Sequence, residues 1–253
     1  MKGLFDLTSR TALVTGACGG LGQAIVQALA VQGARVLVSD FSPDLCKEQA
    51  DRLRAEGHDA QACPANLASV HQVDALCDAA CHVDILVCNA GIQGPAGPMA
   101  AATEEDWQRV FDINLRSSAR LTSRLIPCMA SRGEGSVVLM SSIAGLRGNK
   151  AIGLYGMSKA ALAQLARNLA VEWGPQGVRV NAVSPGLIRT PLAADLMADS
   201  AFMARRMQAT PLRRVGEPEE VAGVVVMLAS RAGGFVTGLN LVVDGGTTVS
   251  DGN

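Results

Sequence analysis

The sequence predicts a single α/β domain built on a doubly wound, seven-stranded parallel sheet with helices on both faces. Short β-rich runs alternate with segments of helical periodicity from one end of the chain to the other. The β-rich runs are almost continuously apolar, which is typical of strands that helices cover on both faces. A length of 253 residues suits one such domain, 1–253, and no linker or repeat divides it.

Seven strands and six helices are expected, in the following order. The strands are TALVTG at 11–16, ARVLVSD at 34–40, HDAQACP at 58–64, VDILVCNAG at 83–91, GSVVLMSS at 135–142, VRVNAVSP at 178–185 and LNLVVDGG at 239–246. The helices are 21–32, 43–56, 69–80, 103–132, 155–173 and 218–229. The spacers are long enough for crossover helices, so the strands are expected to run parallel.

One connection, from residue 185 to about 215, is longer than the others. Connections of more than about 12–15 residues are usually functional, and many are lids. Met197, Phe202, Met203 and Met207 have helix-like spacing in it. The sequence therefore favours a substrate lid at about 187–215, with a helix that only packs against the sheet as the alternative.

Composition excludes several classes of protein. Hydrophobic residues are 49% and charged residues 18%, which rules out disorder, collagen and coiled coil. A net charge of −1 leaves no excess of positive charge that would attract nucleic acid or an anionic membrane. No apolar run approaches the roughly 20 residues of a spanning helix, and the polar start lacks a signal-peptide core, so we expect a cytoplasmic protein. Seven scattered cysteines indicate reduced thiols, and no metal site is expected.

A glycine-rich turn follows the first predicted strand. The segment TGACGGLG at 15–22 places Gly16, Gly20 and Gly22 directly before an amphipathic helix. Glycines permit a tight turn and close backbone approach, and the helix N-terminus offers free N–H groups to a pyrophosphate. The pattern predicts a Rossmann-type dinucleotide site.

Asp40 ends the second predicted strand, about 20 residues after the glycine turn, where an acidic side chain can bind the adenosine ribose. Its charge would repel a 2′-phosphate, and neither Cys18 nor Phe41 offers a cation to receive one. The sequence therefore predicts NAD(H) rather than NADP(H). The alternative is that Asp40 only caps the following turn.

Tyr155 and Lys159 lie four residues apart, on one face of a predicted helix. A tyrosine has a pKa near 10, so proton transfer near neutrality requires nearby positive charge, which Lys159 and a bound nicotinamide could supply. A surface Tyr–Lys pair is the alternative for this motif alone. Ser142, however, ends the fifth predicted strand at the edge where open α/β sheets bind ligands.

With these motifs the chain resembles the classical short-chain dehydrogenase/reductase family. The matches occur in family order over nearly the whole chain: TGACGGLG at 15–22, CNAG at 88–91, Asn114, Ser142, Tyr155, Lys159, SPG at 184–186 and Thr190. The resemblance implies that Tyr155 is the general acid/base, that Ser142 orients and polarises the substrate oxygen, and that Lys159 binds the nicotinamide ribose and lowers the tyrosine pKa. Asn114 would hold a water that extends a proton relay.

The resemblance also implies the remaining contacts. The expected cofactor-binding residues are Gly16, Cys18, Gly20, Leu21, Gly22, Asp40, Phe41, Asn66, Leu67, Asn89, Ala90, Gly91, Tyr155, Lys159, Pro185, Gly186, Ile188 and Thr190. The expected substrate contacts are Gln93, Ser142, Ile143, Ala144, Ile152, Tyr155, Leu187 and Leu192. Asn66 stands where the family often has aspartate, so one charge beside the adenine is missing.

These observations predict an NAD-dependent oxidoreductase that interconverts a secondary alcohol and a ketone. Because the expected substrate contacts are mostly apolar, an uncharged small-molecule substrate is favoured. The enzymatic alternatives are a 3-oxoacyl-[acyl-carrier-protein] reductase, a glucose-type dehydrogenase, and an epimerase or lyase. The non-enzymatic alternative is an NAD-sensing or scaffold protein. The resemblance further implies a homotetramer assembled through 103–132, 155–173 and the last strand.

Overall fold

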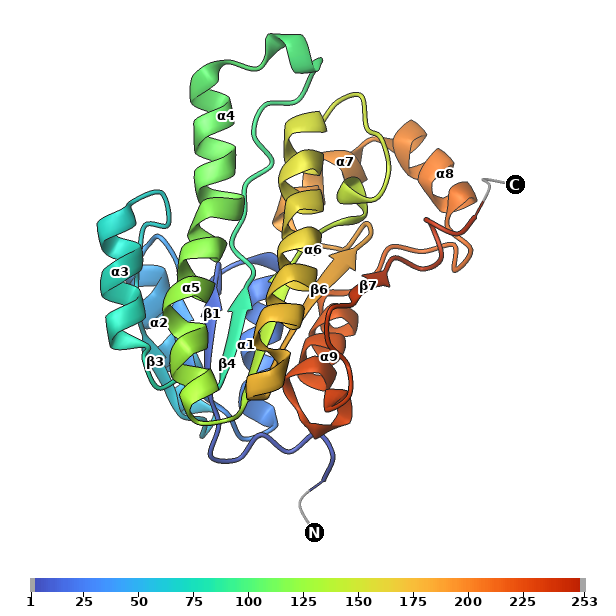
Figure 1. Cartoon of the computed structure of the whole chain (residues 1–253). Helices are drawn as coiled ribbons and strands as arrows, with labels where there is room; N and C mark the ends of the chain where they lie inside the picture. Colours follow the sequence, from blue (N-terminus) through green and yellow to red (C-terminus); the bar gives the residue numbers. More distant parts are fainter. Residues whose placement is uncertain (1–2, 251–253) are drawn as a thin grey trace.

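The computed structural model describes residues 3–250 and contains one seven-stranded sheet (Figure 1). Its strand order is β3-β2-β1-β4-β5-β6-β7, and every neighbouring pair is parallel. The strands are β1 (Thr11–Thr15), β2 (Arg35–Ser39), β3 (Ala60–Ala62), β4 (Ile85–Cys88), β5 (Gly135–Met140), β6 (Val178–Pro185) and β7 (Asn240–Val243). This confirms the predicted fold class. The run at 58–64 was predicted too long, because only three residues of this edge strand pair with β2.

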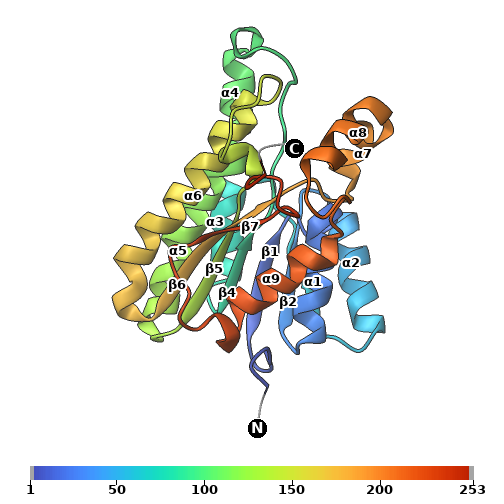
Figure 2. The same cartoon turned by 90° about the vertical axis from the view of Figure 1, so that its right-hand side faces the viewer.

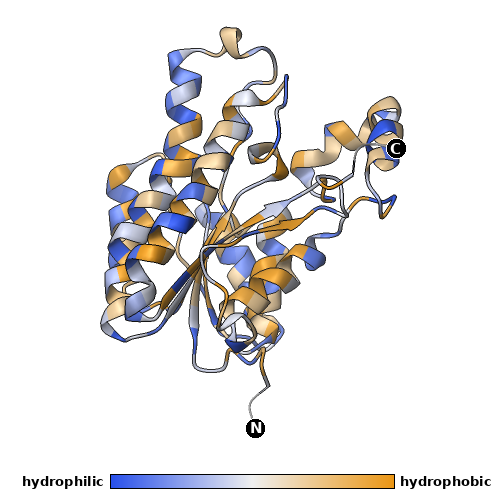
Figure 3. Ribbon diagram, turned by 45° about the vertical axis from the view of Figure 1, so that its right-hand side comes forward, coloured by the Kyte–Doolittle hydropathy of each residue, from blue (hydrophilic) through white to orange (hydrophobic). Residues whose placement is uncertain are grey.

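Helices cover both faces of the sheet (Figure 2). One face carries α1 (Gly20–Val31), α2 (Pro43–Ala55) and α9 (Pro218–Ala229), and the other carries α3 (Val70–Ala79), α5 (Ser117–Ser131) and α6 (Gly153–Trp173). Each face buries its own apolar cluster against the strands, as the concentration of hydrophobic residues along the sheet shows (Figure 3). Burial on both faces explains the nearly continuous apolar strands.

The helix predicted at 103–132 is interrupted, which corrects the sequence-based expectation. It consists of α4 (Glu104–Phe111), a π-helical turn η2 (Asp112–Arg116) and α5. Thr103 and Asp106 form a capping box at its start. A π turn holds one extra residue per turn and so shifts the register of the side chains that follow. Asn114 lies in this turn and is fully buried.

The long connection after β6 contains a short turn, η5 (Pro191–Ala193), and two helices, α7 (Ala194–Ala198) and α8 (Ser200–Ala209). Both helices stand beyond the carboxyl ends of the strands (Figures 1 and 2). No residue of α7 or α8 is fully buried. Within residues 3–250, no helix is both long and apolar enough to cross a membrane.

Candidate active site

A cavity of about 770 Å³ opens at the carboxyl ends of the strands. It lies where β1 is flanked by β2 and β4, the point at which the strand order reverses and open α/β sheets bind ligands. Fourteen of the predicted site residues line it: Gly16, Gly20, Leu21, Asp40, Phe41, Asn66, Leu67, Asn89, Ala90, Gly91, Tyr155, Lys159, Thr190 and Leu192. The structure thus brings together residues from distant parts of the sequence.

Other predicted site residues are not part of this lining. They are Cys18, Gly22, Gln93, Asn114, Ser142, Ile143, Ala144, Ile152, Pro185, Gly186, Leu187 and Ile188. Conversely, the sequence analysis missed ten lining residues: Gly19, Ser39, Ala65, Ala68, Ile92, Arg109, Ile113, Met140, Ser141 and Pro191. Several of these missed residues end or follow a strand. Because open α/β sheets bind ligands at the carboxyl ends of their strands, examining that end of every predicted strand would have found them.

The glycine turn has the backbone that its sequence requires. Gly16 and Gly20 have φ values of +63° and +49°, a region that side chains other than glycine rarely adopt. A Cβ at Gly22 would lie 1.9 Å from the carbonyl oxygen of Gly16, so the helix can approach the turn only without a side chain there. The Asn89 amide donates to the carbonyl oxygens of Thr15 and Gly16 at 3.1 and 2.9 Å and fixes the turn from β4.

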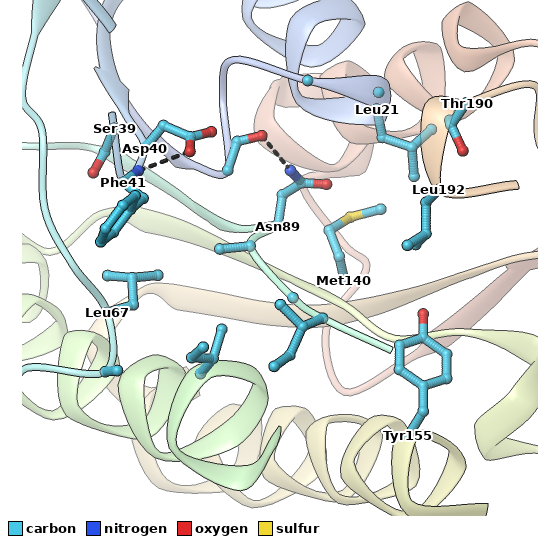
Figure 4. A pocket seen from close by; sticks show the side chains of 18 of the residues that line it. Leu21, Ser39, Asp40, Phe41, Leu67, Asn89, Met140, Tyr155, Thr190 and Leu192 are labelled. Carbon is cyan, nitrogen blue, oxygen red and sulfur yellow. Dashed lines mark hydrogen bonds between the residues drawn. The ribbon is translucent and has the colours of Figure 1, made fainter. Parts of the chain in front are cut away.

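Asp40 occupies one end of the cavity (Figure 4). Its Oδ2 accepts from the Cys18 backbone N–H at 3.0 Å, and its Oδ1 accepts from the Phe41 N–H at 2.7 Å. A carboxylate has about four acceptor positions, so two remain for ribose hydroxyls. The neighbouring Ser39 Oγ is buried without a hydrogen-bond partner among the described residues.

These features fit a dinucleotide. The first turn of α1 has no side-chain cap, so its N–H groups are available to a pyrophosphate, apart from that of Gly22, which donates to the Gly19 carbonyl oxygen at 2.9 Å. Asp40, whose carboxylate could accept hydrogen bonds from ribose hydroxyls, and the exposed Phe41 ring line the same cavity as the glycine turn. The residues present therefore match the adenosine and pyrophosphate portions of such a cofactor.

Tyr155 lies at the opposite end of the cavity from Asp40 (Figure 4). Ser142 is near enough to this phenol to lower its pKa, which places Ser142 beside the cavity although it is not part of the lining. Lys159 Nζ lies 5.5 Å from the centre of the Tyr155 ring and donates to the Met140 carbonyl oxygen at 2.7 Å. The i,i+4 spacing on α6 thus brings the phenol and the amine together, as predicted.

Burial shifts both groups toward their neutral forms. It lowers the pKa of Lys159 to about 8 and raises the pKa of Tyr155, an effect that the Ser142 hydrogen bond partly offsets. The sequence analysis expected a lowered tyrosine pKa. In this structure burial of Tyr155 outweighs the opposing effect of Ser142, so the phenol holds its proton at neutral pH.

Asn114 supports this end of the site from the π turn. Its amide nitrogen donates to Ser158 Oγ and to the Ile92 carbonyl oxygen, both at 2.9 Å, and its Oδ1 accepts from the Ile92 N–H at 2.8 Å. A Cβ at Gly91 would lie 3.1 Å from Lys159 Nζ and 3.3 Å from Asn114 Oδ1. Glycine at position 91 therefore leaves room beside the Lys159 amine.

The fold and the site define a dinucleotide-binding oxidoreductase, and known proteins agree. The family model described as enoyl-(acyl carrier protein) reductase matches residues 16–248. Dehydrogenase/reductase SDR family member 4 of Oryctolagus cuniculus is 36% identical over 95% of this chain and 94% of its own. Cis-4-hydroxycyclohexanecarboxylate dehydrogenase of Sinomonas cyclohexanicum is 40% identical over 94% and 96%.

Two solved structures share the whole architecture. A gluconate 5-dehydrogenase from Burkholderia cenocepacia, in complex with NADP and tartrate, has a TM-score of 0.94 and 31% identity over 98% of each chain. A 7α-hydroxysteroid dehydrogenase complexed with NADH and 7-oxo glycochenodeoxycholic acid has a TM-score of 0.91 and 34% identity over 96% of each chain. The chain belongs to the short-chain dehydrogenase/reductase family.

Proposed function

We propose that this protein is an NAD(H)-dependent oxidoreductase that interconverts a secondary alcohol and a ketone, with Tyr155 as general acid/base. The supporting observation is the arrangement of one cavity, with Asp40 at one end and Tyr155, beside Ser142, at the other. Bound nicotinamide would supply or accept the hydride. Tyr155 would give its proton to the substrate oxygen or take one from it, and Ser142 would hold that oxygen in place.

The preference for NAD(H) rests on Asp40, since similar structures hold NADP in one case and NADH in another. Asp40→Asn keeps the shape of the side chain and removes its charge. Because that charge would lie beside a 2′-phosphate, we expect the variant to bind NADPH about tenfold more tightly. Its affinity for NADH should change less than about threefold, because the amide oxygen still accepts hydrogen bonds.

The measurement is a fluorescence titration of wild type and Asp40→Asn with NADH and with NADPH. Asp44→Asn, in the exposed first turn of α2, is the matched control for loss of one nearby carboxylate. Wild type that prefers NADPH would contradict the role of Asp40 and would favour an acyl-carrier-protein reductase.

A second candidate substrate is an alcohol that also carries a carboxylate, and Arg206 favours it. This half-buried guanidinium on α8 lies 5.6 Å from the centre of the Phe202 ring, and none of the described residues forms a hydrogen bond or ion pair with it. Burial and the charge of Arg147 lower its pKa, and Asp244 partly offsets them. Arg147 lies five residues after Ser142. Two guanidinium groups close enough to interact would together suit an anionic substrate.

The names of similar proteins support this candidate, because they include a hydroxycyclohexanecarboxylate dehydrogenase and a gluconate 5-dehydrogenase. Arg206→Gln is then expected to raise KM for a cyclic hydroxy acid about tenfold and to leave KM for the matching uncharged alcohol within about twofold. Arg205→Gln, at the exposed neighbouring position, is the control. Equal effects on both substrates would refute the carboxylate site and leave the uncharged alcohol as the substrate class.

The single-domain organisation, the lid at about 187–215 and the homotetramer are also part of this proposal. Leu192, in the short turn η5 that precedes α7, lines the cavity, as a lid residue should. Val171 on α6 is 81% exposed, and Leu239 and Val242 at β7 are also exposed. Exposed apolar side chains on these elements favour assembly through them. A monomeric mass in sedimentation would contradict the tetramer.

A further inference from the structure

The glycine turn and α2 are joined by a pair of thiols that the proposed reaction does not use. Cys18 lies in the turn and Cys46 in the second turn of α2, and their sulfur atoms are 3.8 Å apart. Cys46 Sγ also contacts the Asp40 carbonyl oxygen at 3.6 Å, while the Cys18 N–H donates to the Asp40 side chain at 3.0 Å. The two cysteines thus bracket Asp40.

We propose that Cys18 and Cys46 form a reversible disulfide that weakens cofactor binding. This inference rests on the proposed NADH site. A disulfide has a sulfur separation of about 2.05 Å, so closure would draw the two sulfur atoms together by about 1.8 Å. Because Cys18 belongs to the glycine turn and holds the Asp40 carboxylate through its N–H, this movement would displace both parts of the adenosine and pyrophosphate site.

The oxidation balances with a hydroperoxide as the two-electron oxidant. Cys18 is half-buried and Cys46 fully buried, so Cys18 is the sulfur that the oxidant reaches first. Its sulfur bonds to a peroxide oxygen, the O–O bond breaks, and water (or an alcohol) leaves a sulfenic acid. Cys46 sulfur then attacks Cys18 sulfur, the S–O bond breaks, and a second water leaves with the remaining proton.

The electrostatics make Cys46 the more readily ionised thiol of the pair, while access favours Cys18. The hydrogen bond from Cys18 lowers the pKa of Cys46, which suits the resolving thiolate. That hydrogen bond, burial and the charges of Asp40 and Glu48 raise the pKa of Cys18. The first step is therefore slow, so the pair responds to sustained oxidation.

The test treats the full-length protein with hydrogen peroxide, maps its disulfides by peptide mass spectrometry and titrates it with NADH. We expect a Cys18–Cys46 bond, an NADH Kd at least about fivefold higher, and full recovery with dithiothreitol. Cys46→Ala should keep the reduced Kd and lose the response to peroxide. Cys63→Ser removes a neighbouring half-buried thiol and should keep the response.

Oxidation of Cys18 alone, a bond to another cysteine, or a mapped Cys18–Cys46 bond with an unchanged NADH Kd would each overturn the inference. The mapping does not depend on the cofactor. If the reduced protein fails to bind NADH, the proposed function fails, and the coupling of the disulfide to cofactor binding fails with it. If NADH binds and the disulfide does not alter its Kd, only the inference fails.

Discussion

Tyr155→Phe is expected to lower kcat about a thousandfold, because a positioned proton donor or acceptor contributes roughly 10²–10⁴ to the rate. The phenol lies beside Ser142 and stays protonated at neutral pH because burial raises its pKa. It is therefore prepared to donate a proton to a carbonyl oxygen. Phenylalanine keeps the ring beside Lys159 and removes only the hydroxyl.

The measurement is steady-state kinetics with the preferred cofactor, together with an NADH titration. Because the hydroxyl lies at the far end of the cavity from Asp40, the NADH Kd should stay within about twofold of wild type. Met157→Ala, at an exposed position on the same helix, is the control for general disturbance of α6. Turnover that survives in Tyr155→Phe would show that another group transfers the proton.

Lys159→Met is expected to lower kcat at least about a hundredfold and, at the same time, to stabilise the protein at pH 7 by about 2 kcal/mol. Lys159 is 3% exposed, burial lowers its pKa to about 8, and its amine donates a hydrogen bond to the Met140 carbonyl oxygen. At pH 7 the wild type must bury a charge that the unfolded chain keeps in water. Methionine has a similar length and no charge.

The pH dependence of this stability difference has a definite sign. Between pH 8 and about 10.4 the unfolded chain holds the Lys159 proton and the folded chain does not, so raising the pH stabilises wild type relative to the variant. The advantage of Lys159→Met is therefore full below pH 8 and shrinks above it. Taking the difference between the two proteins cancels the opposite contribution of Cys77, whose pKa burial raises and on which Lys159 does not act.

Chemical denaturation of both proteins at pH 7 and at pH 9 measures this difference. A variant less stable than wild type at pH 7 would mean that Lys159 is held by favourable interactions in the folded protein. A stability difference between the two proteins that is the same at pH 7 and pH 9 would show that the pKa of Lys159 in the folded protein does not lie between these pH values.

Much of the fold could be predicted because its signals are local. Apolar runs mark the strands, and the Gly16 turn requires only its own backbone and the helix that follows. The π turn around Asn114 escaped prediction because the helical periodicity continues through it, and one extra residue leaves no compositional mark. Its physical cause lies in tertiary contacts, where the Asn114 side chain bonds to the chain after β4 and to α6.

The site was predictable to a similar degree. Tyr155, Lys159 and Asp40 occupy positions fixed by a helix turn or a strand end, and the structure places all three in one cavity. Arg109 in α4 and Ile113 in η2 were missed because their place in the cavity lining depends on how these two elements pack against the rest of the domain. The contact of Cys18 with Cys46 likewise depends on how α2 is seated beside the glycine turn.

The central claim is that the cavity transfers hydride between NAD(H) and a secondary alcohol or ketone. The most direct test incubates the protein with NADH deuterated at the transferable position and a panel of ketones, both uncharged and carboxylated, and analyses the products by mass spectrometry. The account predicts alcohols that carry one deuterium on the carbinol carbon, and none with Tyr155→Phe. NADH that binds tightly with no deuterium transfer to any ketone would contradict it and would favour an NAD-sensing protein.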